Sequence, residues 1–133
     1  LQQGAPVRRF NWTMTVNPLL DTAPETYPVW GPTRTSLTHD NMGDKMHLRV
    51  ELQALFRLPR SNAIAFSIRC YLGRFDELVS VPKWARRLHR VVRDIHPDVA
   101  AYKGFLRNRD AMALWLAQYD DGAPTSPGWW PQD

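Results

Sequence analysis

The stretch HLRVELQALFRLPRSNAIAFSIRCYL, residues 47–72, decides the fold because apolar and polar side chains alternate along both of its halves. Successive side chains of a strand point to opposite faces of a sheet, so this alternation predicts two β-strands. The turn-forming residues PRSN, at 59–62, separate the halves and predict an antiparallel hairpin. One face of the first strand is apolar and carries Leu48, Val50, Leu52, Ala54, Phe56 and Leu58.

The opposite face of this first strand carries an unusual polar series. Arg49, Glu51 and Gln53 follow one another at alternate positions, and Leu55 and Arg57 continue the face. If the face is covered, the charges of Arg49 and Glu51 must be paired, because an unpaired buried charge is costly. A carboxylate beside an arginine stays ionised, and such a pair could bind an amine or anchor an acid. A buried ion pair without a function is the alternative.

The return strand also has two distinct faces. The first holds Ile64, Phe66, Ile68, Cys70 and Leu72, and the second holds Ala63, Ala65, Ser67, Arg69 and Tyr71. We expect the polar faces of the two strands to coincide, which would add Ser67, Arg69 and Tyr71 to the polar pocket of the first strand. Cys70, on the apolar face, is interpreted as a core thiol.

The segments before the hairpin differ sharply in composition. Residues 7–16 have the β-branched and aromatic content of a strand, whereas residues 17–46 are rich in Pro, Thr, Asp and Gly. The second segment is therefore predicted to be a long loop with at most short structured pieces, a kind of loop that is often functional. We expect Tyr27, Val29 and Trp30 to hold it to the core.

After the hairpin, the apolar spacing becomes that of helices. A helix is predicted from Pro82 until Pro97 ends it, with Trp84, Leu88, Val91 and Ile95 on one face and Arg86, Arg87, Arg90 and Arg93 on the other. A short turn or helix over 98–106 is closed by Gly104. A last helix over about 109–119 is expected to bury Met112, Trp115, Leu116 and Tyr119.

This order of elements predicts one α+β domain with an antiparallel sheet over residues 1–119. Residues 120–133 form a Pro- and Gly-rich tail, whose Trp129-Trp130 pair is expected to dock on the body or on another chain. The chain starts at Leu1, which suggests a processed product or a piece of a longer protein.

Composition narrows the class of protein. The 133 residues suit one domain, and a single cysteine excludes an intrachain disulfide and indicates a reducing compartment. Neither a membrane-spanning apolar run nor a secretory leader is recognisable, so we predict an intracellular, cytoplasmic protein. Residues 45–93 contain eleven Lys or Arg against three acidic residues. We interpret the basic helix there as a solvated face and do not expect nucleic-acid binding, because its tryptophan belongs to the apolar stripe.

Standard catalytic signatures are missing from the sequence. It contains neither CxxC nor HExxH nor a phosphate-binding glycine loop, and its four histidines lack the spacing of a metal pair.

Three segments nevertheless resemble one protein family. Residues 49–61 fit the pattern R-x-E-x-Q-x-L-x-R-L-P-x-[ST] of the haem-dependent oxidative N-demethylase alpha-subunit family, whose fungal members are called HRQ family proteins. RRFNWTM, at 8–14, is similar to the Arg-x-Asn-Trp strand that precedes this motif. HPDVAAYKGFLRNRDAMALWL, at 96–116, resembles the family's Tyr-Lys-Gly region and final helix. The resemblance covers about residues 8–116.

The resemblance implies a PAS-like haem-binding fold and a chemistry. The family's activity is the oxidative removal of a methyl group from a secondary amine such as dimethylamine, using dioxygen and releasing formaldehyde. Flavin and iron–sulfur partner subunits supply the electrons. By this analogy Arg49 lies near a haem propionate or bound oxygen, with Glu51 and Gln53 orienting it, and Glu51 could instead hold the substrate's ammonium group. Arg49 and Glu51 are therefore the candidate catalytic residues.

Two departures from the family bear on this expectation. Leu52 stands where the family has a second arginine, and family members are more than twice as long, with further pocket residues ahead of the Arg-x-Asn-Trp strand. We therefore expect an incomplete PAS-like sheet, with His39 or His47 as replacement iron ligands. The alternative function is a non-catalytic PAS-like domain that binds or senses haem or another small ligand. An open sheet edge would also favour pairing with another chain, as in an oligomer.

Overall fold

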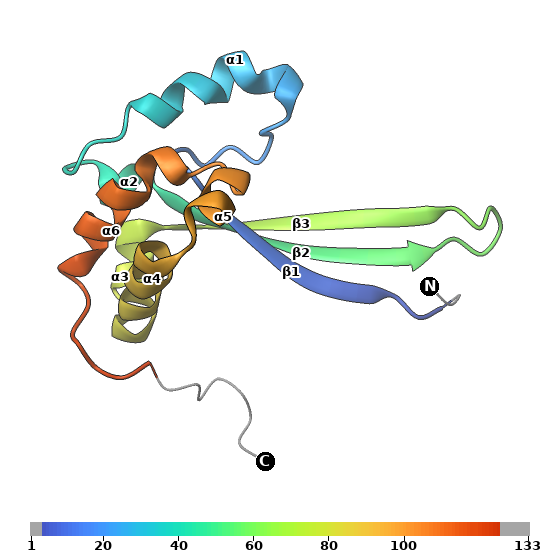
Figure 1. Ribbon diagram of the computed structural model, residues 1–133. Coiled ribbons are helices and arrows are strands. Elements are labelled where there is room, and N and C mark those ends of the chain that lie inside the picture. Colours follow the sequence, from blue (N-terminus) through green and yellow to red (C-terminus); the bar gives the residue numbers. More distant parts are fainter. Residues whose placement is uncertain (1–3, 126–133) are drawn as a thin grey trace.

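Three antiparallel strands form the framework of the computed structural model, which describes residues 4–125 (Figure 1). The strands are β1 (Val7–Thr15), β2 (His47–Arg57) and β3 (Ile64–Arg74), and they lie in the order β1-β2-β3. The predicted strand over 7–16 and the predicted hairpin are confirmed, and so is the α+β class.

Short helices connect and cover the strands. The segment between β1 and β2 contains only brief helical pieces, as predicted: η1 (Pro24–Thr26), α1 (Tyr27–Trp30), η2 (Gly31–Thr35) and α2 (Met42–Lys45). After the sheet come α3 (Phe75–Val79), α4 (Pro82–Asp94), α5 (Pro97–Tyr102), η3 (Leu106–Asn108) and α6 (Arg109–Ala117). No helix between residues 4 and 125 is long and apolar enough to cross a bilayer.

The hydrophobic core lies at one end of the sheet, where the helices gather (Figure 1). Its buried members are Met14, Val16, Met42, Met46, Phe75, Val92, Ala100, Phe105, Met112, Trp115 and Leu116. At the other end the three strands extend beyond the helices as a ribbon (Figure 1). We call this end the distal sheet and define it as residues 7–10, 52–57 and 64–69. The predicted core of the last helix is confirmed for Met112, Trp115 and Leu116, and Tyr119 packs partly buried against it.

Helix α4 has the predicted bounds but buries a different face. Ala85, His89 and Val92 are its buried residues, whereas Trp84 is 54% exposed and Val91 is exposed as well. The predicted apolar stripe is thus wrong for these two residues. The buried face contains a histidine whose ring Nδ1 lies 2.8 Å from Asp120 Oδ2, and hydrophobic periodicity does not reveal such a paired polar residue.

The expected anchoring of the long loop is also wrong in part. Tyr27 and Val29 are exposed. Trp30 packs edge-on against Tyr27 and donates its indole N–H to Ala23 O at 2.9 Å, so these aromatics organise the loop itself. The loop is held to the sheet by Arg49 instead, whose guanidinium donates to Leu19 O and Leu20 O.

The start of the C-terminal tail is fixed to α4 by charge. Asp120 accepts two hydrogen bonds from the Arg90 guanidinium, at 2.9 and 2.7 Å, and Asp121 accepts one from Arg86 at 2.9 Å. Residues 120–121 are therefore part of the folded unit. The Trp129-Trp130 pair lies outside the described residues.

Two leucines of α6 give a matched test of the packing. Leu116 is buried in the core and Leu114 is exposed to solvent. Leu116→Ala should lower the free energy of unfolding by about 2–5 kcal/mol, because it leaves a cavity. Leu114→Ala should change it by less than about 0.5 kcal/mol. Urea unfolding of both variants measures the difference, and equal losses would contradict this placement of α6.

The tail contact makes a prediction about acid stability. The hydrogen bonds from Arg90 and then His89 hold the pKa of the Asp120 carboxyl well below its usual range. A lowered folded-state pKa contributes stability that is fully present above the unfolded value of about 3.9 and is lost progressively as the pH falls from there toward the folded-state pKa. Asp120→Asn should lower the melting temperature at pH 7, and this difference from the unmodified chain should shrink steadily as the pH falls below about 4. Asp98→Asn, at an exposed carboxylate, is the control.

Candidate functional site

The strand register brings a polar group of side chains together on one face of the sheet. Arg49 lies opposite Thr13 of β1, Glu51 opposite Asn11 and Gln53 opposite Arg9. Because directly opposed residues of antiparallel strands share a face, these six side chains form one surface. We call Arg49, Glu51 and Gln53 the polar row.

The expected contribution of β3 to this surface is wrong. Ser67, Arg69 and Tyr71 lie opposite Ala54, Leu52 and Val50, which places them on the other face of the sheet. The reason is the turn, in which Leu58 N donates to Ala63 O at 2.8 Å and Asn62 adopts a left-handed conformation (φ 56°). With a turn of this length, odd-numbered residues of β2 lie opposite even-numbered residues of β3. The face of the polar row therefore receives the apolar side of β3, which consists of Ile64, Phe66, Ile68, Cys70 and Leu72.

Cys70 accordingly belongs to the polar face and is only half-buried. Its thiol sulfur accepts a hydrogen bond from Arg49 Nη2 at 2.9 Å. The interpretation of Cys70 as a core thiol is therefore wrong.

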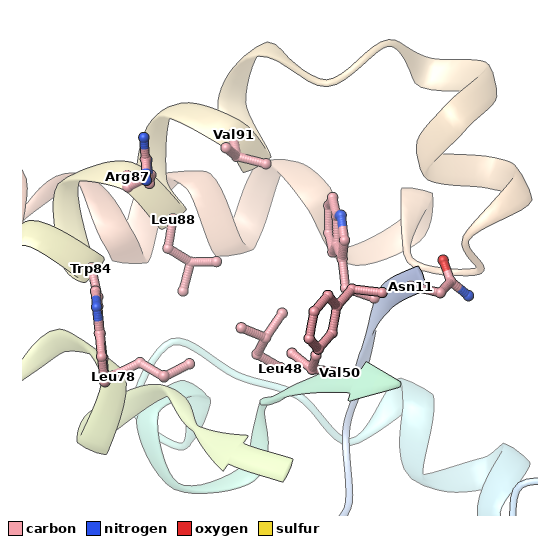
Figure 2. A pocket seen from close by; sticks show the side chains of 10 residues that line it. Asn11, Leu48, Val50, Leu78, Trp84, Arg87, Leu88 and Val91 are labelled. Carbon is pink, nitrogen blue, oxygen red and sulfur yellow. The ribbon is translucent and has the colours of Figure 1, made fainter. Parts of the chain in front are cut away.

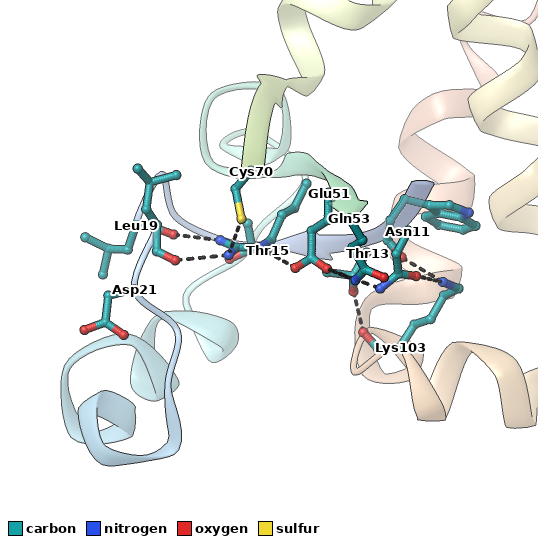
Figure 3. Close-up of polar contacts among 12 residues, drawn as sticks. Asn11, Thr13, Thr15, Leu19, Asp21, Glu51, Gln53, Cys70 and Lys103 are labelled. Atoms are coloured by element: carbon teal, nitrogen blue, oxygen red, sulfur yellow. Dashed lines mark hydrogen bonds and ion pairs between the residues drawn. The ribbon is translucent and has the colours of Figure 1, made fainter. Parts of the chain in front are cut away.

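Arg49 has four hydrogen-bond partners, of which Figure 3 labels Leu19, Glu51 and Cys70. The residue is only 8% exposed. Its guanidinium donates to Leu19 O at 3.3 Å, to Leu20 O at 3.1 Å and to Glu51 Oε1 at 3.3 Å, besides the thiol of Cys70. A buried guanidinium must be compensated in this way. Arg49 thus fastens the start of the long loop to the centre of the sheet.

Glu51 is satisfied by three donors of the protein. Burial alone raises the pKa of its carboxyl group, but hydrogen bonds from Gln53, Arg49 and Asn11, together with the charge of Arg49, outweigh burial and lower the pKa. Gln53 Nε2 lies 2.9 Å from Glu51 Oε2, and Gln53 in turn accepts from Arg9 Nε at 2.7 Å. Glu51 is therefore a fixed carboxylate.

Lys103 joins the site from the connection between α5 and η3. Neither the hydrophobic periodicity nor the charge pattern of the sequence indicates this role. Its ammonium donates to Trp12 O at 2.7 Å and to Asn11 Oδ1 at 3.3 Å, and lies 4.5 Å from the centre of the Trp12 ring. Burial lowers its pKa, which the charge of Glu51 partly opposes. The one signal in the sequence was the Tyr-Lys-Gly resemblance. Gly104, with φ 78°, lets the chain turn directly after the lysine.

A polar cavity of about 210 Å³ lies between the polar row, the long loop and this connection. Arg34, Arg49 and Lys103 line it together with Glu51, so three cations face one carboxylate. Such an excess of positive charge favours an anion or a neutral molecule over a cation. The volume is below the range of roughly 300–1,000 Å³ typical of drug-sized ligands, so the cavity suits a small molecule.

An apolar groove of about 470 Å³ lies on the other face of the sheet, under α3 and α4 (Figure 2). Its walls are Phe10, Trp12, Leu48, Val50, Leu78, Trp84, Leu88 and Val91, with Asn11 and Arg87 completing the lining. The exposed Trp84 and Val91 of α4 are thus accounted for as groove walls. The groove fits an apolar ligand, and its lining shares no residue with that of the polar cavity.

The two candidate iron ligands do not reach either site. His47 is buried, with its ring Nδ1 2.9 Å from Lys45 O, and His39 is exposed in the long loop. Neither lines the polar cavity or the groove. Among residues 4–125, no cluster of three or more His, Cys, Asp or Glu side chains could hold a metal ion.

A comparison with known protein families matches residues 1–113 to the one described as "haem-dependent oxidative N-demethylase, alpha subunit-like". The chain belongs to this family. The match includes the polar row and Lys103, which confirms the family suggested by the sequence motif. The family description implies dependence on haem.

The described residues of this N-demethylase-like chain do not form a complete haem site. Haem iron is held by His, Cys, Met or Tyr, and none of these lines the apolar groove. In the polar cavity the lining contains Met14 and Met46, but both are buried in the core. Of the cations that could meet haem carboxylates, Arg34, Arg49 and Lys103 line the polar cavity and only Arg87 lines the groove.

The hydrogen bond between Gln53 and Glu51 can be tested by titration. Gln53→Leu should raise the pKa of the Glu51 carboxyl, because it removes the donor that lowers this pKa most. Gln118→Leu, which removes an amide that donates to Trp115 O on α6, should leave the pKa of Glu51 unchanged. Carboxyl ¹³C NMR as a function of pH measures both, and an unchanged Glu51 titration in Gln53→Leu would contradict the geometry.

Proposed function

We propose that this chain takes part in haem-dependent oxidative N-demethylation of a small secondary amine, with dioxygen as oxidant and formaldehyde as product. The supporting observation is that Arg49 and Glu51 of the polar row, which lie within the residues matched to the family, line a small polar cavity. In this proposal the cavity binds the amine, the iron ligand comes from outside residues 4–125, and an electron-transfer partner supplies electrons.

The charges of the cavity indicate the form in which an amine would bind. Arg34, Arg49 and Lys103 repel an ammonium ion, and Glu51 already accepts from three donors of the protein. A secondary amine would therefore bind as the neutral base, with its N–H directed at a carboxylate or amide oxygen. Glu51 and Gln53 orient Arg49, and Arg49 holds the loop that covers the cavity.

A second function is favoured by the same charges and by the lack of an iron ligand at either site in the described part of the chain. The cavity would then bind a small carboxylate without catalysis, as in a sensing domain. A guanidinium and an ammonium facing one cavity are suitable partners for a carboxylate.

One set of measurements separates the two functions. The purified chain is mixed with haem, imidazole as a substitute for the iron ligand that residues 4–125 do not supply, dimethylamine, dioxygen and a chemical electron donor. Released formaldehyde and the haem absorption spectrum are recorded. The demethylase proposal predicts formaldehyde release. Arg49→Gln should reduce it about 10–100-fold, since hydrogen bonds to charged groups contribute roughly 1.5–3 kcal/mol. Arg93→Gln, at an exposed arginine of α4, should stay within about twofold of the unmodified chain.

The alternative makes the opposite prediction. NMR titration with acetate would then shift the signals of Arg49 and Lys103, without any formaldehyde release in the turnover assay. Saturable acetate binding combined with an unchanged haem spectrum would overturn the demethylase proposal for this chain.

A further inference from the structure

Strand β3 is an open edge of the sheet. In the part of the chain that the structure describes, β2 pairs with one side of β3 and no strand pairs with the other. Natural proteins usually protect such edges with lysines, prolines, bulges or short strands. The eleven residues of β3 contain neither Lys nor Pro, and their register with β2 is unbroken. The edge is therefore available for pairing.

Two hydrogen bonds fix which backbone groups face outward. Leu58 N donates to Ala63 O at 2.8 Å at one end of the hairpin, and Phe75 N donates to Met46 O at 2.9 Å at the other. Hydrogen-bonded and non-hydrogen-bonded pairs alternate along an antiparallel ladder. The bonds at both ends show that the odd-numbered residues of β3 bond to β2. The N–H and C=O groups of Ile64, Phe66 and Ile68 consequently point away from β2.

These three residues also present exposed apolar side chains. Ile64 is 55% exposed, Phe66 50% and Ile68 49%, and all three lie on the face of the polar row. They belong to the distal sheet, over which no helix packs (Figure 1). Outward backbone donors and acceptors therefore coincide with an apolar side-chain stripe, the combination that an added strand recognises.

The surroundings of this edge are basic. Residues 52–73 contain Arg57, Arg60 and Arg69 and no Asp or Glu. Arg69 is exposed and projects from the opposite face to the apolar stripe, 5.4 Å from the centre of the Tyr71 ring. A partner strand beside β3 would thus meet apolar side chains on one face and a positive charge on the other.

We propose that the β3 edge binds a strand of another protein in which acidic and apolar residues alternate. Its backbone extends the sheet, its apolar side chains cover Ile64, Phe66 and Ile68, and its carboxylates face Arg69. A second copy of this chain fits less well, because it would bring the same arginines to the edge. Nucleic acid would neutralise the arginines but leave Ile64 and Ile68 of the apolar stripe uncovered. The inference does not depend on the demethylase proposal.

The test uses two synthetic peptides with blocked ends, one of alternating Glu and Val and one of alternating Lys and Val. Binding is followed by NMR and by hydrogen exchange of the amides of Ile64, Phe66 and Ile68. The Glu–Val peptide should bind at least about tenfold more tightly than the Lys–Val peptide and should protect these three amides.

Two variants separate the contributions of backbone and charge. Ile68→Pro removes an outward N–H without removing a bond to β2, so it should weaken binding about tenfold relative to Ile68→Ala. Arg69→Glu should abolish the preference for the Glu–Val peptide. Because it leaves the backbone unchanged, Arg69→Glu remains informative if the proline variant does not fold.

Several outcomes would overturn the proposal. They are equal binding of the two peptides, equal binding by Ile68→Pro and Ile68→Ala, and protection of amides elsewhere than on β3. Dimerisation of the chain through β3 in sedimentation experiments without peptide would assign the edge to a second copy. Tighter binding of a single-stranded RNA than of the Glu–Val peptide would assign it to nucleic acid.

Discussion

The burial of the Arg49 guanidinium is the constraint on which the site depends. A positive charge that is 8% exposed must be compensated, and here the compensation comes from Glu51, Cys70 and the carbonyls of Leu19 and Leu20. Two of these partners belong to the sheet and two to the long loop. The same contacts therefore compensate the charge of Arg49, add to the lowering of the Glu51 pKa that the hydrogen bond from Gln53 leads, and hold the loop beside the polar cavity.

The chain has two hollows of different chemistry. One is a small cavity beside the polar row with an excess of positive charge, and the other is a larger apolar groove beneath α4. The chain belongs to the haem-dependent oxidative N-demethylase, alpha subunit-like family, whose description implies haem. Among the described residues, however, none that could bind haem iron lines the groove.

The sequence allowed the fold class, all three strands, α4 and α6 to be predicted, because each has a strong local period or a proline boundary. It also led to Arg49, Glu51 and Gln53, since a charged pair on a covered strand face must be compensated. The wrong predictions concern how segments that are distant in the sequence pack against one another. Whether β3 presents Cys70 or Tyr71 to the polar row depends on the number of residues in one turn, which strand periodicity does not specify. Lys103 enters the site, and His89 becomes buried, only through tertiary contacts.

Hydrogen exchange of the long loop tests the role of Arg49 most directly. In Arg49→Met, the backbone amides of residues 17–23 should exchange faster than in the unmodified chain, while those of α4 and α6 should not change, because only the loop loses its link to the sheet. Arg69→Met, at an exposed arginine of β3, should leave residues 17–23 unaffected. Unchanged exchange of residues 17–23 in Arg49→Met, or faster exchange throughout the protein, would contradict this account of Arg49.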